Sequence, residues 1–325
     1  MTHAVVVHET GGPETLCWEP HDPGSPGPGQ VRVTLRAAGV NFIDVYFRTG
    51  LYPRPLPFVA GLEGAGVVEA VGPDVEDLAT GDRVAWSSVP GSYAETLVAP
   101  ADSLVGVPDT VSDEAAAAVM LQGMTAHYLV HSVRETRPGD VALVHAAAGG
   151  VGLLLIQLLA RAGATVIGTC SSAEKEALAR AAGATHVIRY DRGEFAPEVR
   201  KRTEGIGCNV VYDSVGRATF EGSLASLRPR GLLVLFGQSS GPVAPFELQR
   251  LVALGSLFVT RPSLAHYTAT RDALEMRAQA VLGAVADRTL DVRIGARYPL
   301  RQAADAQRAL EARATTGKVL LLAEA

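Results

Sequence analysis

The sequence is poor in cysteine and in aromatic residues, and both shortages exclude classes of protein. Its three cysteines, Cys17, Cys170 and Cys208, are odd in number and far apart along the 325 residues, so they indicate no disulfide framework. Aromatic residues make up 6% of the chain and never alternate with basic runs, which argues against a nucleic-acid surface.

The sequence also lacks an excess of positive charge and a long apolar segment. Lysine and arginine number 29 against 34 aspartates and glutamates, so the net charge of −5 gives no electrostatic case for nucleic acid or an anionic membrane. No apolar run reaches the length of about 18 residues that a membrane helix needs. Residues 1–14 contain no basic segment followed by an apolar one. We therefore expect no signal peptide, no membrane contact and a cytoplasmic enzyme.

What the chain does contain is a strand, a turn of small residues and a helix in succession. Residues 141–144 are an apolar run of strand length, and an apolar helical run extends from 153 to 161. The turn between them reads Ala147-x-Gly149-x-x-Gly152, the dinucleotide fingerprint with alanine in place of its first glycine. Such a turn lets the backbone approach a pyrophosphate, to which the helix N-terminus donates N–H groups. The stretch predicts a nucleotide site.

The residues after the next apolar run, 164–168, select the nucleotide. An NAD site carries an acidic residue about 20 residues after the glycines, to bind the ribose 2′-hydroxyl. Here Ser171 and Ser172 follow, and then Lys175. Hydroxyl groups and a cation suit a 2′-phosphate, which favours NADPH over NADH. The alternative is that Lys175 only decorates a solvated helix. Further candidates for the same phosphate follow the third strand: Arg189, Tyr190 and Arg192.

The rest of the chain divides into stretches with different patterns of predicted secondary structure. Residues 1–123 contain short β-branched runs separated by glycine and proline, which predicts an antiparallel or barrel-like unit ending in a helix over 113–120. Residues 124–262 begin with a second helix, over 125–133, and then alternate strand and helix. This alternation predicts a doubly wound parallel sheet. Residues 263–325 revert to helices, followed by a closing strand over 318–322 that could return to the first unit.

Ligands of a doubly wound sheet bind beyond the carboxyl ends of its strands. Ser214 follows the predicted strand 208–212, and Phe236 and Gly237 end the next one. Each of these residues alone is a turn residue, but their shared position predicts that they line the cofactor cleft.

Four stretches together resemble a known family: residues 37–46 with 50–53, residues 146–152, residues 210–216 and residues 259–264. They are similar to the zinc-independent quinone oxidoreductases of the medium-chain dehydrogenase/reductase superfamily, the group that includes zeta-crystallin. The likeness covers nearly the full chain. It implies a GroES-like catalytic domain formed by residues 1–123 and 263–325, a Rossmann domain formed by residues 124–262, NADPH as cofactor, a homodimer, and the reduction of quinones.

The resemblance also assigns residues to the site. It implies that Asn41, Asp44, Tyr46 and Tyr52 line the catalytic centre, although Asn41 and Asp44 could simply cap a turn and the tyrosines could be packing residues. The cofactor-binding residues that the turn, the strand ends and the resemblance predict are Asn41, Phe42, Tyr128, Ala147, Gly149, Gly150, Val151, Gly152, Ser171, Lys175, Tyr190, Ser214, Phe236, Gly237, Arg261 and Arg313. Arg261 could instead be a surface cation between domains.

The zinc ligands of related dehydrogenases are missing. Those relatives carry a cysteine where this chain has Asn41, and Gly-His-Glu where it reads Gly61-Leu62-Glu63. A catalytic zinc needs three protein ligands. His127 and His131 have helical i, i+4 spacing but lack the intervening glutamate of a metalloprotease motif, so we interpret them as packing or surface histidines. We expect no metal.

Without a Lewis acid to polarise a carbonyl, the acceptor should already be electrophilic. A quinone fits best, and the reaction needs the acceptor close to the nicotinamide in a dry slot. Water, Tyr46 or Tyr52 could supply any proton, and hydride and single-electron transfer both stay open. The alternatives are an NADPH-dependent enone, alkenal or enoyl reductase, and a non-enzymatic protein that binds NADPH or RNA; the acidic balance argues against RNA.

Two apolar segments near the end of the nucleotide-binding half, residues 232–236 and 256–259, could form strands at a sheet edge. Exposed strand edges tend to be covered, often by a two-fold partner. We therefore predict a homodimer whose sheets join there.

Overall fold

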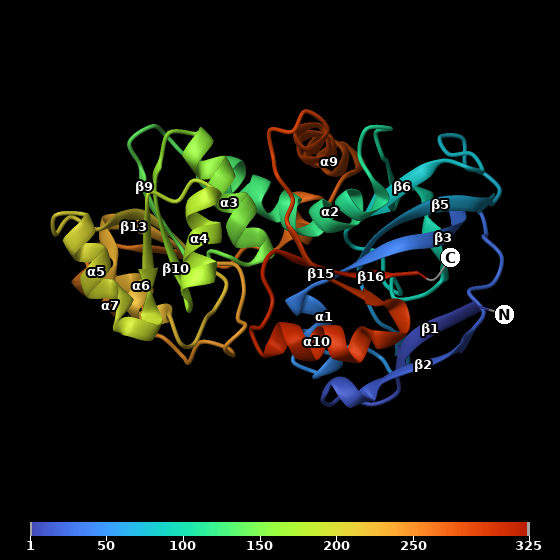
Figure 1. Ribbon diagram of the computed structural model, residues 1–325, viewed down its shortest axis with the longest axis horizontal. Coiled ribbons are helices and arrows are strands. Elements are labelled where there is room, and N and C mark those ends of the chain that lie inside the picture. Colours follow the sequence, from blue (N-terminus) through green and yellow to red (C-terminus); the bar gives the residue numbers. More distant parts are fainter. Residues whose placement is uncertain (1, 324–325) are drawn as a thin grey trace. The chain divides into compact units, whose positions relative to one another are not determined.

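The computed structural model describes residues 2–323 and divides the chain into two compact units, residues 1–124 with 268–325 and residues 125–267 (Figure 1). Residues 1, 324 and 325, which the predicted first domain includes, lie outside the described residues. Each unit has its own sheet and its own buried core, so each is described by itself.

The first unit is organised around strand β3 (Gln30–Val40), in which Val31, Val33 and Leu35 alternate with less buried residues. Antiparallel partners lie along both of its sides, and the chain's last strand, β16 (Lys318–Leu322), is one of them, as predicted. The sheet also contains β5 (Glu63–Val71), β6 (Arg83–Trp86), β7 (Thr96–Pro100), β8 (Val105–Gly106) and β15 (Ile294–Pro299). A smaller sheet contains β1 (Thr2–Val7), β2 (Leu16–His21) and β4 (Phe58–Val59).

The helices of this unit are α1 (Phe42–Arg48), α9 (Arg271–Ala286), α10 (Ala303–Glu311) and most of α2 (Asp113–Tyr128). The prediction of two separate helices over 113–120 and 125–133 was wrong. α2 is continuous through Gly123 and leads into a π-helical turn, Leu129–Val133. A glycine inside a helix costs about 1 kcal/mol relative to alanine. Here packing favours it, because a Cβ at this position would lie 2.6 Å from Val119 Cγ2 and 3.4 Å from Val281 of α9.

The second unit contains the predicted parallel sheet. Its six strands run in the order β11 (His186–Arg189), β10 (Thr165–Cys170), β9 (Val141–Val144), β12 (Cys208–Asp213), β13 (Leu227–Leu235) and β14 (Phe258–Thr260), and every neighbouring pair is parallel. The direction of progression reverses between β9 and β12, which is the switch point where such sheets bind ligands. The prediction of a doubly wound parallel sheet is confirmed.

Helices cover both faces of this sheet. Figure 1 shows α3 (Gly150–Arg161) and α4 (Ala173–Ala181) on one side of the strands, with α5 (Phe195–Arg202) and α6 (Phe220–Ala225) on the other. Two short helices, α7 (Gln249–Ala253) and α8 (Leu264–Tyr267), complete the unit. Among residues 2–323, no helix is long and apolar enough to cross a membrane.

Candidate active site

Helix α1 begins directly after β3, and its first turn is fixed by its own polar residues. Asn41 precedes the helix in an extended conformation, and its backbone N–H donates to Asp44 Oδ2 at 2.8 Å. The carboxylate of the third helical residue thus satisfies a backbone donor that a helix end would otherwise leave exposed. This geometry places Asn41, Phe42 and Asp44 together at the end of the central strand.

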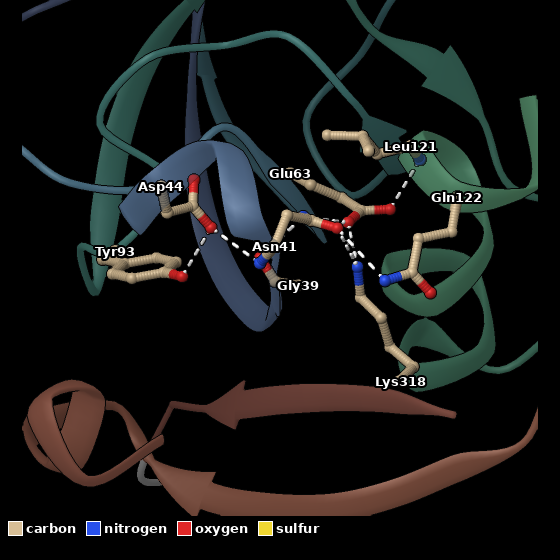
Figure 2. A network of polar contacts seen from close by, with 8 residues as sticks. All are labelled: Gly39, Asn41, Asp44, Glu63, Tyr93, Leu121, Gln122 and Lys318. Carbon is tan, nitrogen blue, oxygen red and sulfur yellow. Dashed lines mark hydrogen bonds and ion pairs between the residues drawn. The ribbon is translucent and has the colours of Figure 1, made fainter. Parts of the chain in front are cut away.

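The Asn41 amide is buried, and neighbouring residues use all of its hydrogen-bonding groups (Figure 2). Its Nδ2 donates to Glu63 Oε2 at 2.8 Å and to the Gly39 carbonyl at 3.2 Å. Its Oδ1 accepts from Lys318 Nζ at 2.9 Å and from Gln122 Nε2 at 3.3 Å. Two donated and two accepted hydrogen bonds fix which way the amide points.

Glu63 and Lys318 form an ion pair with side chains 0% and 1% exposed. Glu63 Oε1 also accepts from the backbone N–H of Leu121 at 2.6 Å. A side chain at Gly39 would collide with this pair, because its Cβ would lie 2.2 Å from Glu63 Oε2 and 2.7 Å from Lys318 Nζ. Sequence reasoning missed Lys318. The available signal was a lysine opening an otherwise apolar strand, Lys318–Leu322.

Asp44 lies beside this network. Burial raises the pKa of its carboxyl to about 7, against the lowering effects of hydrogen bonds from Asn41 and Tyr93. The Tyr93 hydroxyl donates to Oδ2 at 2.8 Å, whereas Oδ1 has no hydrogen-bond partner among residues 2–323. Burial and the charge of Asp44 also raise the pKa of Tyr93 well above its ordinary value. Asp44 therefore exchanges its proton near neutral pH.

The predicted aromatic residues gather beside α1. The ring centroids of Tyr46 and Tyr52 lie 5.2 Å apart, edge to face, and those of Phe42 and Tyr46 lie 6.3 Å apart. The backbone N–H of Tyr52 donates to the Tyr46 carbonyl at 3.0 Å, which holds the loop against the helix. The structure thus brings Asn41, Phe42, Asp44, Tyr46 and Tyr52 together; their catalytic roles stay predictions.

In the second unit, the small-residue turn has the form that a pyrophosphate needs. α3 begins at Gly150 after the extended Gly149, and no side chain caps its first N–H groups. A Cβ at Gly152 would lie 2.4 Å from the Ala146 carbonyl oxygen, so only glycine permits this close turn. Ala147 connects the turn to β10 by donating its N–H to the Thr169 carbonyl at 3.0 Å. Uncapped N–H groups at the carboxyl end of a strand fit a dinucleotide.

The residues predicted to hold a 2′-phosphate follow two adjacent strands. Cys170 of β10 pairs in register with Arg189 of β11, so Ser171 and Tyr190 leave the sheet at neighbouring points. Ser172 caps α4 by accepting from the Lys175 N–H at 3.3 Å, which places Lys175 in the first turn of that helix.

The other predicted binding residues of this unit fall into two places. Ser214 and Gly237 touch, since a Cβ at Gly237 would lie 2.6 Å from the Ser214 carbonyl oxygen. Arg261 Nη1 donates to the Leu235 carbonyl at 2.9 Å, directly before Phe236. Tyr128 lies elsewhere in the unit, stacked on Tyr267 with ring centroids 4.3 Å apart. The predicted Arg313 belongs to the first unit, on the turn after α10, with φ of +57°.

Comparison with known proteins identifies the family. Residues 27–109 match the alcohol dehydrogenase GroES-like domain family, and residues 150–278 match the zinc-binding dehydrogenase family. A quinone oxidoreductase of Pseudomonas aeruginosa is 48% identical over 96% of this chain and 97% of the relative. The chain belongs to the quinone oxidoreductase family of the medium-chain dehydrogenase/reductase superfamily. The resemblance noted in the sequence is confirmed.

Two further relatives are informative. The 2-haloacrylate reductase of a Burkholderia species is 43% identical over the full length of both chains. The structure of Escherichia coli quinone oxidoreductase, solved in complex with NADPH, superposes with a TM-score of 0.96 at 41% identity, covering 98% of this chain and 99% of that one.

One of the two families that match this chain is described as zinc-binding, yet the residues beside α1 do not fit zinc. Asn41 Oδ1 and Glu63 Oε2 already contact the Lys318 ammonium. Leu62 offers no donor atom. Within residues 2–323, no group of three or more histidine, cysteine, aspartate or glutamate side chains could hold a metal ion.

Proposed function

We propose that the protein transfers reducing equivalents from NADPH to a quinone. The observation that carries this proposal is the uncapped first turn of α3 at the switch point, together with serines and Lys175 in place of an acid after β10. The proposal is supported by family membership and by the NADPH complex of the Escherichia coli relative. When bound, NADPH supplies the hydride or electrons that the acceptor takes up.

The protein's own residues bind and orient the cofactor and the acceptor, and they exclude water from the site. The N–H groups of Gly150, Val151 and Gly152 bind the pyrophosphate, and Ser171 and Lys175 bind the 2′-phosphate. The aromatic side chains of Phe42, Tyr46 and Tyr52 offer a flat acceptor an apolar surface that excludes water from the transfer. A hydroxyl group of Tyr46 or Tyr52, or water, supplies the proton that the reduced acceptor takes up.

The test is stopped-flow oxidation of NADPH by an ortho-quinone and a para-quinone, repeated with NADH and with a chelator. We expect fast oxidation that depends on the quinone, prefers NADPH and ignores the chelator. Oxidation that requires added zinc, or that shows no preference between NADPH and NADH, would contradict the proposal.

Reduction of an electron-poor alkene is the second candidate, and two observations favour it. The Burkholderia relative is named 2-haloacrylate reductase. Arg54 lies near the aromatic residues of the site, with its guanidinium 4.8 Å from the Phe58 ring centroid and 5.6 Å from that of Phe47. Burial lowers the pKa of Arg54, against the raising effect of the Asp44 charge. A charged acrylate should then react faster than its methyl ester; equal rates would remove Arg54 from the argument.

We propose further that the protein forms a homodimer and acts in the cytoplasm. β14 is the edge strand of the second unit's sheet, and its Phe258 and Val259 side chains are 60% and 40% exposed. An exposed apolar edge strand is typically paired. Val259→Lys should therefore dissociate a dimer seen by light scattering, and a wild-type protein that is monomeric at micromolar concentration would contradict this part.

A further inference from the structure

A buried chain of polar side chains lies at the carboxyl ends of β9, β10 and β12. It contains His145, Thr169, Asp213 and Ser223, none of which is more than 1% exposed. His145 Nδ1 lies 2.9 Å from Thr169 Oγ1, and its Nε2 lies 3.0 Å from Ser223 Oγ. The Ser223 hydroxyl in turn donates to Asp213 Oδ2 at 2.8 Å. Sequence reasoning gave no role to any of these four side chains.

Asp213 is a buried carboxylate that is satisfied by hydrogen-bond donors. Its Oδ1 accepts from the backbone N–H groups of Val215 at 2.8 Å and Gly216 at 3.0 Å, and both oxygens accept from the Thr219 hydroxyl. These contacts fold the loop that contains Ser214. Because several donors converge on its two oxygens, Asp213 acts as the acceptor in this network.

Asp213 fixes the direction of the hydrogen bonds along this row of side chains as far as His145 Nε2. Ser223 has one proton and gives it to the carboxylate, so its oxygen accepts from His145, whose Nε2 must carry a hydrogen. In the neutral imidazole the remaining nitrogen, Nδ1, carries no hydrogen and accepts from the Thr169 hydroxyl. Burial, which lowers the pKa of His145 against the charge of Asp213, favours the same neutral form. Phe195, the ring packed edge to face on the imidazole, carries no charge.

This arrangement differs from a hydrolytic triad. In a triad the histidine accepts the serine proton, which makes the serine a nucleophile. Here the serine proton is committed to Asp213, so Ser223 is not activated. These hydrogen-bonded side chains serve instead to connect loops.

The connected loops carry predicted cofactor-binding residues. The His145 N–H donates to the Tyr212 carbonyl at 3.1 Å, and His145 directly precedes the turn that ends at Gly152. The Asp213 carbonyl accepts from Phe236 N–H at 2.9 Å and from Gly237 N–H at 3.4 Å. The side chain of His145 therefore links the loop after β9 through Ser223 to Asp213, whose backbone carbonyl contacts the residues after β13.

We propose that His145 is a positioning residue for NADPH. Through Ser223 and Asp213 it holds the pyrophosphate turn and the Ser214 loop in the spacing that the dinucleotide requires. The inference rests on the proposed function, because the cofactor's affinity is what the positioning changes.

Two substitutions of His145 separate this role from packing. The amide nitrogen of His145→Gln can reach the position of Nε2 and keep the donation to Ser223, whereas the shorter His145→Asn can replace only the contact with Thr169. We expect the Asn variant to bind NADPH at least about tenfold more weakly, since a hydrogen bond that orients the loops is lost, and the Gln variant to bind within about threefold of wild type. Ser223→Ala should match the Asn variant. The readout is the dissociation constant of NADPH from titration calorimetry, measured on folded protein at a common temperature.

Thr203→Val is the matched control. It removes a buried hydroxyl of the same unit, which donates to the Val199 carbonyl at 2.9 Å and accepts from the Gly207 N–H at 3.0 Å, before the opposite end of β12. It should lower the melting temperature and leave NADPH binding unchanged. If the Asn and Gln variants bind equally, or if Thr203→Val weakens binding as much, the inference is overturned. Wild-type protein that fails to bind NADPH would instead overturn the proposed function, and this inference with it.

Discussion

The two units each bury a carboxylate beside their functional residues, but they stabilise it by different means. In the first unit, Glu63 is paired with the Lys318 ammonium, and both contact the Asn41 amide. In the second unit, Asp213 is surrounded by N–H and O–H donors from its own loop and from α6. The charge of Glu63 is balanced by a single cation, whereas Asp213 is stabilised by several donors, none of which is a cation. Removing one partner of the buried carboxylate should therefore lower the free energy of unfolding by different amounts in the two units.

The largest effect should come from removing the cation of the first unit. Lys318→Met leaves Glu63 buried without its counter-charge, and breaking a buried ion pair from one side costs about 3–5 kcal/mol. Urea denaturation of the variant measures this loss in the free energy of unfolding. The double variant Lys318→Met/Glu63→Gln removes both charges and should recover a large part of the stability. A double variant as unstable as the single one would show that the ion pair is not the cause.

The next effect tests a third carboxylate, Asp44, for which the described residues 2–323 provide only the Asn41 N–H and the Tyr93 hydroxyl as donors. With a pKa of about 7 in the folded protein, Asp44 keeps a proton that the unfolded chain releases near its ordinary value of 3.8. The folded state thus binds more protons between these values, so Asp44 reduces stability as the pH rises from about 4 to about 7 and adds no further change above.

Asp44→Asn removes this titration. The stability of the variant relative to wild type should rise by roughly 2–4 kcal/mol between pH 4 and pH 8, as follows from the size of the pKa shift. Thermal or urea unfolding at both pH values measures the difference, with Asp82→Asn as a control at an exposed aspartate. A constant difference between the two proteins at all pH values would mean that Asp44 is ionised throughout.

These carboxylates also show how far the sequence predicts the site. The strand, turn and helix over 141–161 are contiguous, so their periodicity and glycines predict the nucleotide site locally. Glu63 and Lys318 are 255 positions apart and meet only because β16 pairs with β3. The lysine that opens the apolar strand Lys318–Leu322 is a local signal, but its burial against Glu63 depends on this pairing. The continuity of α2 through Gly123 was missed for the same reason, since the packing of α9 on that glycine decides it.

A moderate effect is expected from the second unit. Ser223→Ala removes one donor from Asp213 and one acceptor from His145, while the N–H groups of Val215 and Gly216 and the Thr219 hydroxyl remain. Leaving buried partners unsatisfied costs about 1–3 kcal/mol. Denaturation under the conditions used for Lys318→Met should therefore give the smaller loss. A loss as large as that of Lys318→Met would remove the contrast between the two ways of burying a carboxylate.

The smallest effect on stability should come from a second lysine, Lys175. Unlike Lys318, it lies in the first turn of a surface helix, where a positive charge faces the positive end of the helix dipole. Lys175→Met should change the free energy of unfolding by less than about 0.5 kcal/mol.

The same substitution should weaken NADPH binding about tenfold through loss of one charged contact with the 2′-phosphate, and leave NADH binding unchanged. Titration with both nucleotides measures this selectivity. Equal weakening of NADH and NADPH would show that Lys175 does not contact the 2′-phosphate, and the two lysines would then differ only in burial. Selective loss of NADPH would instead assign one lysine to stability and the other to cofactor choice.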